Sequence, residues 1–320
     1  MRQHTRAIIL GTGAAVALLA ALAALFAPYV AALKMAALQN GSTVNPMPTG
    51  LDPRARIVDG WFVVLPIDQA TFAIGEPRYG QCNFAYLLVG SRAALLWDSG
   101  PGIRNIHDVT ARLTNLPVTA MPSHLHFDHV GGLRFFSKVA LPDMAGLRER
   151  TRDGHLQLGR FEFLGLIEGM RPPTLSVTQW IKPGSEIDLG NRKLKILAAP
   201  GHTDNSTVLL DEQTGNLFTG DTIYPGHVWD FLPGTDLRVL RKTVFSMRAQ
   251  TRPGAILFGG HGCNDQAPGL RIPQLDAGAW QSLQGAVDRA LVPNFTFVVP
   301  RTIASDPPIS LDAKAEWMAK

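Results

Sequence analysis

Hydrophobic positions begin the chain as one continuous run. From Ala7 to Leu33 no residue carries a charge and nearly all are apolar. A run of this length can cross a bilayer as a helix, and Arg2 and Arg6 precede it. We therefore expect residues 1–36 to form a targeting or anchoring segment rather than a helix of the core.

Two kinds of export segment fit this leader. Pro28 could end the helix and Val30-Ala31-Ala32 could serve as a cleavage site, but the apolar run exceeds the roughly 7 to 15 residues usual in a signal peptide. A transmembrane signal-anchor is therefore favoured over a cleaved signal peptide. Either form predicts that the rest of the chain is exported to the periplasmic or another extracytoplasmic face of the membrane, with the membrane as a partner of the leader.

Beyond the leader the pattern changes to that of a globular domain. Residues 37–57 have no hydrophobic period and are rich in Gly, Pro, Ser and Asn, which is typical of a linker. Strand-like apolar runs then lie at residues 61–65, 83–89, 93–97, 117–121, 194–197, 208–210, 217–219 and 256–258. Helical spacing occurs over 103–113 and 237–247, the second helix begun by Thr235 or Asp236. This alternation predicts a mixed α/β fold.

Two further segments have weaker patterns. Between His129 and His202, residues 147–150 have helical character and 161–170 form an apolar run, which could be a lid over a pocket but is favoured as ordinary core. Residues 280–291 have helical spacing and 295–299 alternate as a strand. We expect residues 263–320 to pack on the main domain as this helix and strand.

Charge and cysteine content exclude several classes of protein. The net charge is +4, but Arg2, Arg6 and Lys34 lie in or beside the leader, so the remaining basic and acidic residues nearly balance. No basic surface for nucleic acid is indicated. Cys82 and Cys263 are the two cysteines, which rules out a disulfide framework or a CxxC metal site and leaves one bridge between them as an open alternative.

The densest chemistry lies in the run Ser123-His124-Leu125-His126-Phe127-Asp128-His129-Val130-Gly131-Gly132. His124 and His126 alternate, so in an extended loop they point the same way and can bind one ion, while Asp128 and His129 turn toward a neighbouring position. This spacing predicts two metal ions. A polar surface loop with chance histidines is the less favoured alternative.

Other histidine and aspartate side chains follow apolar, strand-like runs in the same way. They are His202 after residues 194–197, Asp221 after 217–218 and His261 after 256–258, and Asp98 likewise follows 95–97. Because strand ends fix the positions of the loops that they carry, we expect these side chains to converge on one rim of a sheet scaffold.

The HxHxDH run followed by Gly-Gly resembles the signature of the metallo-β-lactamase superfamily, over about residues 58–262. The resemblance implies a four-layer αββα sandwich as the catalytic domain. It also implies that His124, His126 and His202 bind one metal, that Asp128, His129 and His261 bind a second, and that Asp221 bridges them together with a hydroxide. Nitrogen and oxygen ligands make zinc the default, at two ions per chain, with iron or manganese also tolerated.

Three residues have expected roles in or around this site. We expect Asp128 to take part in catalysis as well as to bind a metal. Asp98 is expected to orient a ligand histidine, with a helix N-cap as the weaker alternative. Tyr224 matches the place of a tyrosine in lactone-hydrolysing members that would stabilise the developing oxyanion, although a buried structural tyrosine fits the sequence equally well.

The resemblance implies a hydrolase that cleaves an ester-type acyl bond, such as a lactone or thioester, in a small-molecule substrate. A β-lactam substrate is less favoured, because Asp221 stands where β-lactam-cleaving members typically carry Cys or Ser. The Gly-Cys-Gly-Arg run of glutathione thioesterases is replaced by Tyr224-Pro225-Gly226-His227. A persulfide-oxidising iron enzyme and a non-catalytic binding module are the alternatives from other classes, and the oligomeric state is not indicated.

Overall fold

The computed structural model describes residues 18–19, 21–22, 26, 44–262, 270–292, 301–304 and 309–313. Most of the leader, the strand predicted over 295–299 and Cys263 lie outside these residues. Within them, no helix combines the length and the hydrophobicity that crossing a membrane requires. The transmembrane and export assignments of the leader stay predictions.

Two six-stranded sheets form the centre of the molecule. The first contains, in spatial order, β1 (Arg56–Val58), β2 (Phe62–Pro66), β3 (Thr71–Gly75), β4 (Phe84–Val89), β5 (Ala94–Trp97) and β6 (Val118–Met121). The second contains β11 (Glu186–Asp188), β12 (Lys193–Ala198), β13 (Thr207–Asp211), β14 (Leu217–Gly220), β16 (Ile256–Gly259) and β17 (Gln274–Asp276). Neighbouring strands are antiparallel except for β5–β6 and β14–β16, which are parallel.

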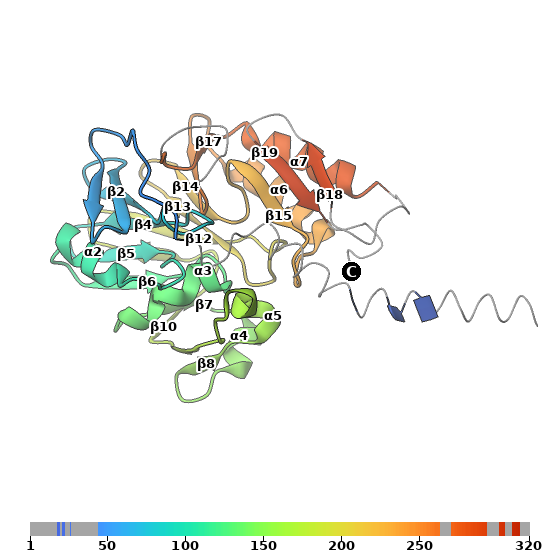
Figure 1. The fold of residues 1–320 in the computed structure, drawn as a ribbon, viewed down its shortest axis with the longest axis horizontal. Helices are drawn as coiled ribbons and strands as arrows, with labels where there is room; N and C mark the ends of the chain where they lie inside the picture. The colour runs from blue at the N-terminus through green and yellow to red at the C-terminus, as the bar shows by residue number, and fades with distance from the viewer. Residues whose placement is uncertain are drawn as a thin grey trace, which may run out of the picture.

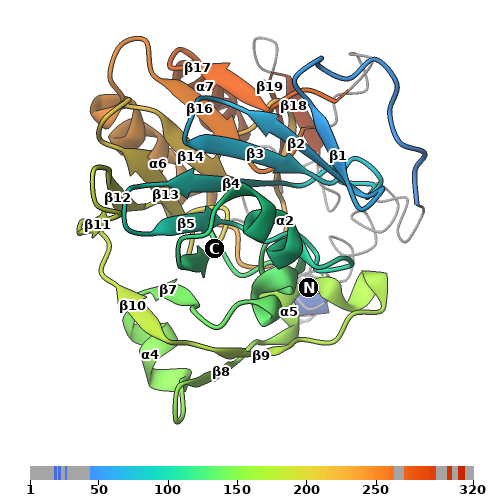
Figure 2. The same ribbon diagram turned by 90° about the vertical axis from the view of Figure 1, so that its left-hand side faces the viewer.

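Helices cover the outer face of each sheet. α2 (Ile106–Leu113) packs on the first sheet, whereas α6 (Leu237–Gln250) and α7 (Ala279–Ala290) pack together on the second. Figure 1 shows these layers in order from α2 to α7, and Figure 2 shows the first sheet, blue to teal, against the yellow and orange strands of the second. The predicted αββα sandwich is confirmed.

Aromatic side chains fill the space between the sheets. Tyr86 of β4 lies 5.0 Å from Phe218 of β14 and 5.8 Å from Phe258 of β16, between ring centroids. Its hydroxyl donates a hydrogen bond of 2.7 Å to the carbonyl of Gly259. Because β14 and β16 lead directly to Asp221 and His261, this packing fixes the strands that carry two candidate ligands.

Smaller elements surround the sandwich. Along the chain, nine short elements connect β6 of the first sheet to β11 of the second. They are α3 (Phe127–Val130), η1 (Gly131–Phe135), β7 (Ala140–Pro142), α4 (Ala145–Arg150), β8 (His155–Gln157), α5 (Arg160–Phe163), η2 (Gly165–Glu168), β9 (Thr174–Ser176) and β10 (Gln179–Ile181). The part from β7 to β10, green in Figure 2, extends below the sheets. A three-stranded sheet on the other side consists of β15 (Gly226–Asp230), β19 (Ile309–Ala313) and β18 (Arg301–Ala304).

Most predicted elements are confirmed, with local differences. The N-cap of α6 is Asp236, whose side chain accepts hydrogen bonds from the amides of Arg238 and Val239. The apolar run over 161–170 is only partly core, because Phe163 and Leu164 are buried whereas Phe161 and Leu166 are about half exposed. Asp128 and His129, which were expected to turn toward a neighbouring position, lie on the helical turn α3. In the two central sheets, β1, β3, β11 and β17 were not predicted, and β1 overlaps the end of the expected linker.

Candidate metal centre

Seven predicted side chains meet at the rim where the strands end. His124 and His126 lie in the loop after β6, and Asp128 and His129 lie on α3. His202, Asp221 and His261 follow β12, β14 and β16. They form two groups of potential ligands, His124–His126–His202–Asp221 and Asp128–His129–His261, each with ligand atoms within 4.8 Å of one another.

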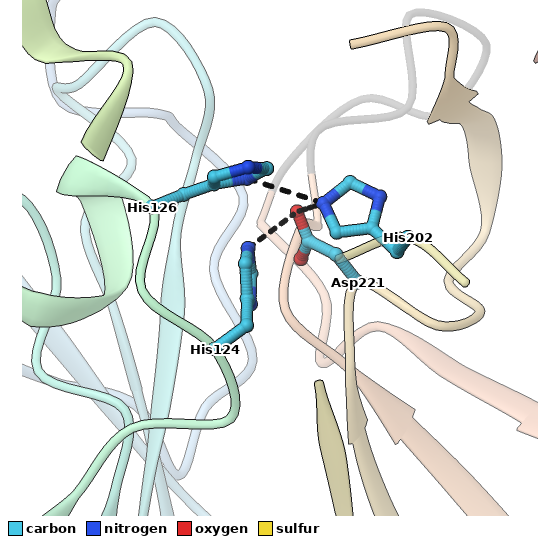
Figure 3. A group of neighbouring side chains, drawn as sticks. All are labelled: His124, His126, His202 and Asp221. Atoms are coloured by element: carbon cyan, nitrogen blue, oxygen red, sulfur yellow. Dashed lines mark hydrogen bonds and ion pairs between the residues drawn. The ribbon is translucent and has the colours of Figure 1, made fainter. Parts of the chain in front are cut away.

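The first group converges from three separate loops, as Figure 3 shows. Nε2 of His202 lies 3.2 Å from Nδ1 of His126 and 3.7 Å from Oδ2 of Asp221. Nε2 of His124 lies 3.9 Å from the same carboxylate oxygen. Ring nitrogens and a carboxylate oxygen that face one another at these distances leave room for one small cation between them.

Asp221 also reaches the second group. Its Oδ1 lies 3.2 Å from Nε2 of His129, and its Oδ2 lies 3.1 Å from Nε2 of His261. Oδ2 of Asp128 stands 3.5 Å from each of these two nitrogens. One carboxylate thus faces imidazoles of both groups, as expected of a bridging ligand.

The chemistry of these buried atoms fits a metal. Among the described residues, Nε2 of His124, Nε2 of His129 and Oδ1 of Asp221 have no hydrogen-bond partner although all three are buried. Buried polar atoms without partners are costly, and a cation would satisfy all three. Burial lowers the pKa of His124 and His126 well below the usual value, so both rings are neutral, which is the form that binds metal.

Negative charge accumulates at the second group. Burial alone would lower the pKa of His129, but Asp221, Asp98 and Asp128 raise it well above its usual value. Burial would raise the pKa of Asp221, yet His261 and His129 lower it well below normal. The carboxylates around His129 therefore require a compensating positive charge, which either a proton on His129 or a metal ion supplies.

The ring nitrogens that face away from the centre have partners of their own. Nδ1 of His129 lies 3.0 Å from Oδ2 of Asp98, and Nδ1 of His202 lies 3.3 Å from Oδ1 of Asp230. Nδ1 of His261 lies 3.0 Å from the carbonyl oxygen of Gln81, and Nδ1 of His124 lies 3.0 Å from Oγ of Ser123. Such contacts fix the tautomer and the ring orientation of a metal ligand.

The structure places Asp98 beside His129, a candidate metal ligand. Its other oxygen, Oδ1, accepts a hydrogen bond of 2.6 Å from the amide of Ser123, at the start of the histidine run. The alternative of a helix N-cap is wrong, because Asn105 caps α2 through the amide of His107.

Three contributors were missed by the sequence reasoning. Asp230 ends a strand in the same way as the predicted ligands, so the same signal could have found it. Asn83 donates a hydrogen bond of 2.9 Å from Nδ2 to Oδ2 of Asp128. Gln81 acts through its backbone carbonyl, for which side-chain patterns give no signal.

Two glycines permit the close approach of backbone to the site. A Cβ on Gly131 would lie 2.1 Å from the carbonyl oxygen of Pro101, and one on Gly260 would lie 2.5 Å from Oδ1 of Asp221. The glycine after HxHxDH therefore lets α3 dock on the loop after β5, and the glycine before His261 leaves space for Asp221.

Tyr224 lies next to the centre but is largely buried. Its ring packs against the ring of His261 at 5.0 Å, and its hydroxyl accepts a hydrogen bond of 3.1 Å from the amide of Trp229. Burial and the nearby Asp221 and Asp230 raise its pKa well above the usual value, so the hydroxyl keeps its proton. A structural role for Tyr224 is therefore visible.

A further buried carboxyl lies behind Asp128. Glu76 accepts a hydrogen bond of 2.6 Å from Nε1 of Trp61 and is almost fully buried. Burial raises its pKa to about 8, with a hydrogen bond from Trp61 opposing and Asp128 adding to the rise. Glu76 is therefore mostly neutral at physiological pH.

Comparison with known proteins gives the family and the fold. Residues 80–301, more than half of the chain, match the family model described as "Metallo-beta-lactamase superfamily". The chain is 30% identical over 193 residues to a chicken (Gallus gallus) protein named acyl-coenzyme A thioesterase MBLAC2, covering 54% of this chain and 70% of that protein. The human (Homo sapiens) protein of that name is 28% identical over 199 residues, covering 54% and 70%.

A solved structure of similar fold is the metallo-beta-lactamase from Pontibacter korlensis. The TM-score is 0.52 at 16% identity, and the match covers 71% of this chain and 99% of that one. At this identity the likeness concerns the fold alone.

We expect His126→Ala and Asp128→Ala each to lower metal content by about one ion per chain while the domain stays folded. The reason is that each variant removes a ligand from a different group, whereas the sheets do not depend on these loop side chains. Metal analysis and circular dichroism of the purified proteins would test this. His155, an exposed histidine, provides the control His155→Ala, which should keep the metal content of the wild type. Wild-type metal content in both ligand variants would refute the assignment.

We also expect Glu76→Gln to change how stability depends on pH. The folded-state pKa of Glu76, about 8, lies above its usual value of 4.5. The native state therefore holds this proton more tightly, and its stabilising contribution is full below pH 4.5 and is lost as pH rises through 8. Glutamine keeps the hydrogen bond from Trp61 without titrating. Denaturant unfolding at pH 5.5 and 7.5 should show a larger decrease in the free energy of unfolding for the wild type than for the variant. Equal decreases would mean that Glu76 is ionised in the native state at both pH values.

Proposed function

The chain belongs to the metallo-beta-lactamase superfamily and is a hydrolase of that superfamily, and from this premise we propose that it cleaves the thioester bond of an acyl-coenzyme A or a similar acyl thioester. The observation that carries the proposal is the pair of ligand groups that share Asp221. The names of the chicken and human relatives support the thioester as the substrate class.

Two cations bound here would lower the pKa of a water molecule between them and polarise the substrate carbonyl, which supplies both a nucleophile and a Lewis acid. We propose zinc as the metal, because the candidate ligands are imidazoles and carboxylates. The protein's own contribution is to hold the ligands in fixed orientations. Asp98, Asp230 and the Gln81 carbonyl do this for the histidines.

Asp128 and Asp221 give the centre a strongly anionic character. Both lie within 3.5 Å of Nε2 of His261 and of Nε2 of His129. The proposal assigns Asp128 to the second metal and, with it, to the reaction centre. The carboxylate at Asp221 also makes a β-lactam a less favoured substrate than an acyl ester or thioester.

Apolar residues lie next to several candidate site residues in sequence. Phe127 lies between His126 and Asp128 in sequence, and its ring packs 6.2 Å from that of Phe163 on α5. Phe231 and Leu232 directly follow Asp230 and belong to the same hydrophobic cluster. All four side chains are buried in the core behind the centre.

The proposal is tested by turnover of defined substrates. Zinc-loaded protein should release free thiol from acyl-coenzyme A, with weaker or no cleavage of a β-lactam, and His126→Ala should be inactive. Cleavage of lactones without any thioester turnover would move the substrate to the lactone class. A preparation with one iron per chain and no hydrolysis would contradict the proposal and favour a persulfide-oxidising enzyme.

We expect Tyr224→Phe to lower kcat for ester-type substrates with metal content unchanged. The hydroxyl accepts from the Trp229 amide and keeps a proton that it can donate to a carbonyl oxygen as negative charge develops. Loss of one such donor typically lowers turnover by about 10²- to 10³-fold. Steady-state kinetics on each substrate that the wild type cleaves would measure this. Unchanged kinetics, with only a lower melting temperature, would leave Tyr224 as a purely structural residue.

A further inference from the structure

Asp230 is a buried carboxylate that the sequence signature of the centre does not include. Its side chain is almost fully buried, with 0% of the residue exposed, and Oδ1 lies 3.3 Å from Nδ1 of His202. A buried carboxylate is costly unless it is paired or hydrogen-bonded. The contact with His202 connects this carboxylate to the first group of candidate metal ligands.

The backbone around His202 is held by the segment that follows Asp230. Oγ1 of Thr235 donates a hydrogen bond of 3.1 Å to the carbonyl of His202. The amide of Asp236 donates one of 2.8 Å to the carbonyl of Gly201. The His202 loop is therefore fixed both at its backbone and at the outer nitrogen of its ring.

The strand that carries Asp230 is placed by the C-terminal part of the chain. β15 runs parallel to β19, in register from Gly226 opposite Ile309 to Asp230 opposite Ala313. β19 in turn pairs with β18 and packs against α7. Figure 1 shows β15, β19 and β18 beside α6 and α7. The paired residues 309–313 lie beyond the part of the chain that matches the family model, residues 80–301.

Asp221 and Asp230, at the two ends of one short segment, thus both contact the first ligand group. Asp221 is itself a ligand candidate, and Asp230 contacts His202. Between them Ile223 and Val228 are fully buried. Displacement of β15 would therefore move the partner of His202 relative to Asp221.

We propose that Asp230 is a positioning residue that orients His202 for the first metal group, and that pairing of β15 with β19 makes the C-terminal strand part of the support of that group. Asp98 has the corresponding position for the second group, through His129. The inference rests on the proposed metal centre and is independent of which acyl substrate the enzyme cleaves.

The experiment measures metal binding of the full chain, with Co²⁺ and Zn²⁺ as probes. Asp230→Ala removes the acceptor, whereas Asp230→Asn keeps an oxygen that can accept from Nδ1 but removes the charge. Loss of such a partner typically weakens metal affinity by about 10- to 100-fold. We expect one ion to bind more weakly by about this factor in Asp230→Ala, an intermediate change in Asp230→Asn, and normal affinity for the other ion.

Reference variants identify which ion is weakened. The Co²⁺ spectrum of Asp230→Ala with one equivalent bound should match that of His126→Ala, which retains the second group, and should differ from that of Asp128→Ala. Asp288→Asn, which removes the charge of an exposed carboxylate that pairs with Arg241 on the outer helices, is the matched control and should bind both ions normally.

The possible outcomes are distinct. Two ions bound to Asp230→Ala with wild-type affinity would overturn the inference and leave the proposed function intact. Equal weakening of both ions, together with a lower melting temperature of the metal-free protein, would also overturn it, because Asp230 would then be a general structural residue. Absence of metal binding by the wild type would overturn both the inference and the proposed function.

Discussion

The centre depends on one constraint, the position of the Asp221 carboxylate between two groups of imidazoles. Its oxygens lie between 3.1 and 3.9 Å from nitrogens of His124, His129, His202 and His261. Charges buried at such distances are stable only when opposite charge and hydrogen bonds compensate them. The lowered pKa of Asp221 and the raised pKa of His129 show that the protein keeps this carboxylate ionised and compensated. A site of this kind has to be built on strands that do not move.

The sandwich provides that rigidity through packing from both sheets. Tyr86 connects the first sheet to Phe218, Phe258 and the carbonyl of Gly259, at the ends of the strands that lead to Asp221 and His261. At the opposite end of the strands, the buried Arg192 donates hydrogen bonds to Asp211 in the second sheet and to Thr71 in the first. The two sheets are thus connected by an aromatic core near the site and, away from it, by the hydrogen bond from Arg192 to Thr71.

Much of this could be predicted from the sequence because the relevant signals are local. The run from His124 to His129 shows its ligand spacing directly, and apolar runs before Asp98, His202, Asp221 and His261 mark strand ends. The helical turn at Asp128 and His129 could not be read in the same way, since a stretch of four residues is too short to show a helical period. The contacts of Gln81 and Asn83 could not be predicted either. Both residues lie before β4 of the first sheet and become adjacent to the site only when the chain folds.

Each ligand group combines two residues of the histidine run with a histidine from a later loop. Asp128 and His129 are neighbours on one helical turn, and Asp98, whose Oδ2 lies 3.0 Å from Nδ1 of His129, directly follows β5. The first group needs His202, whose loop lies 76 residues beyond His126, and whose ring partner is placed by a strand from the C-terminal part of the chain. Contacts between residues far apart in sequence form only when the whole fold is in place. Both groups therefore depend on tertiary structure that the signature motif does not encode, because His202 completes the first group and His261, from the loop after β16, completes the second.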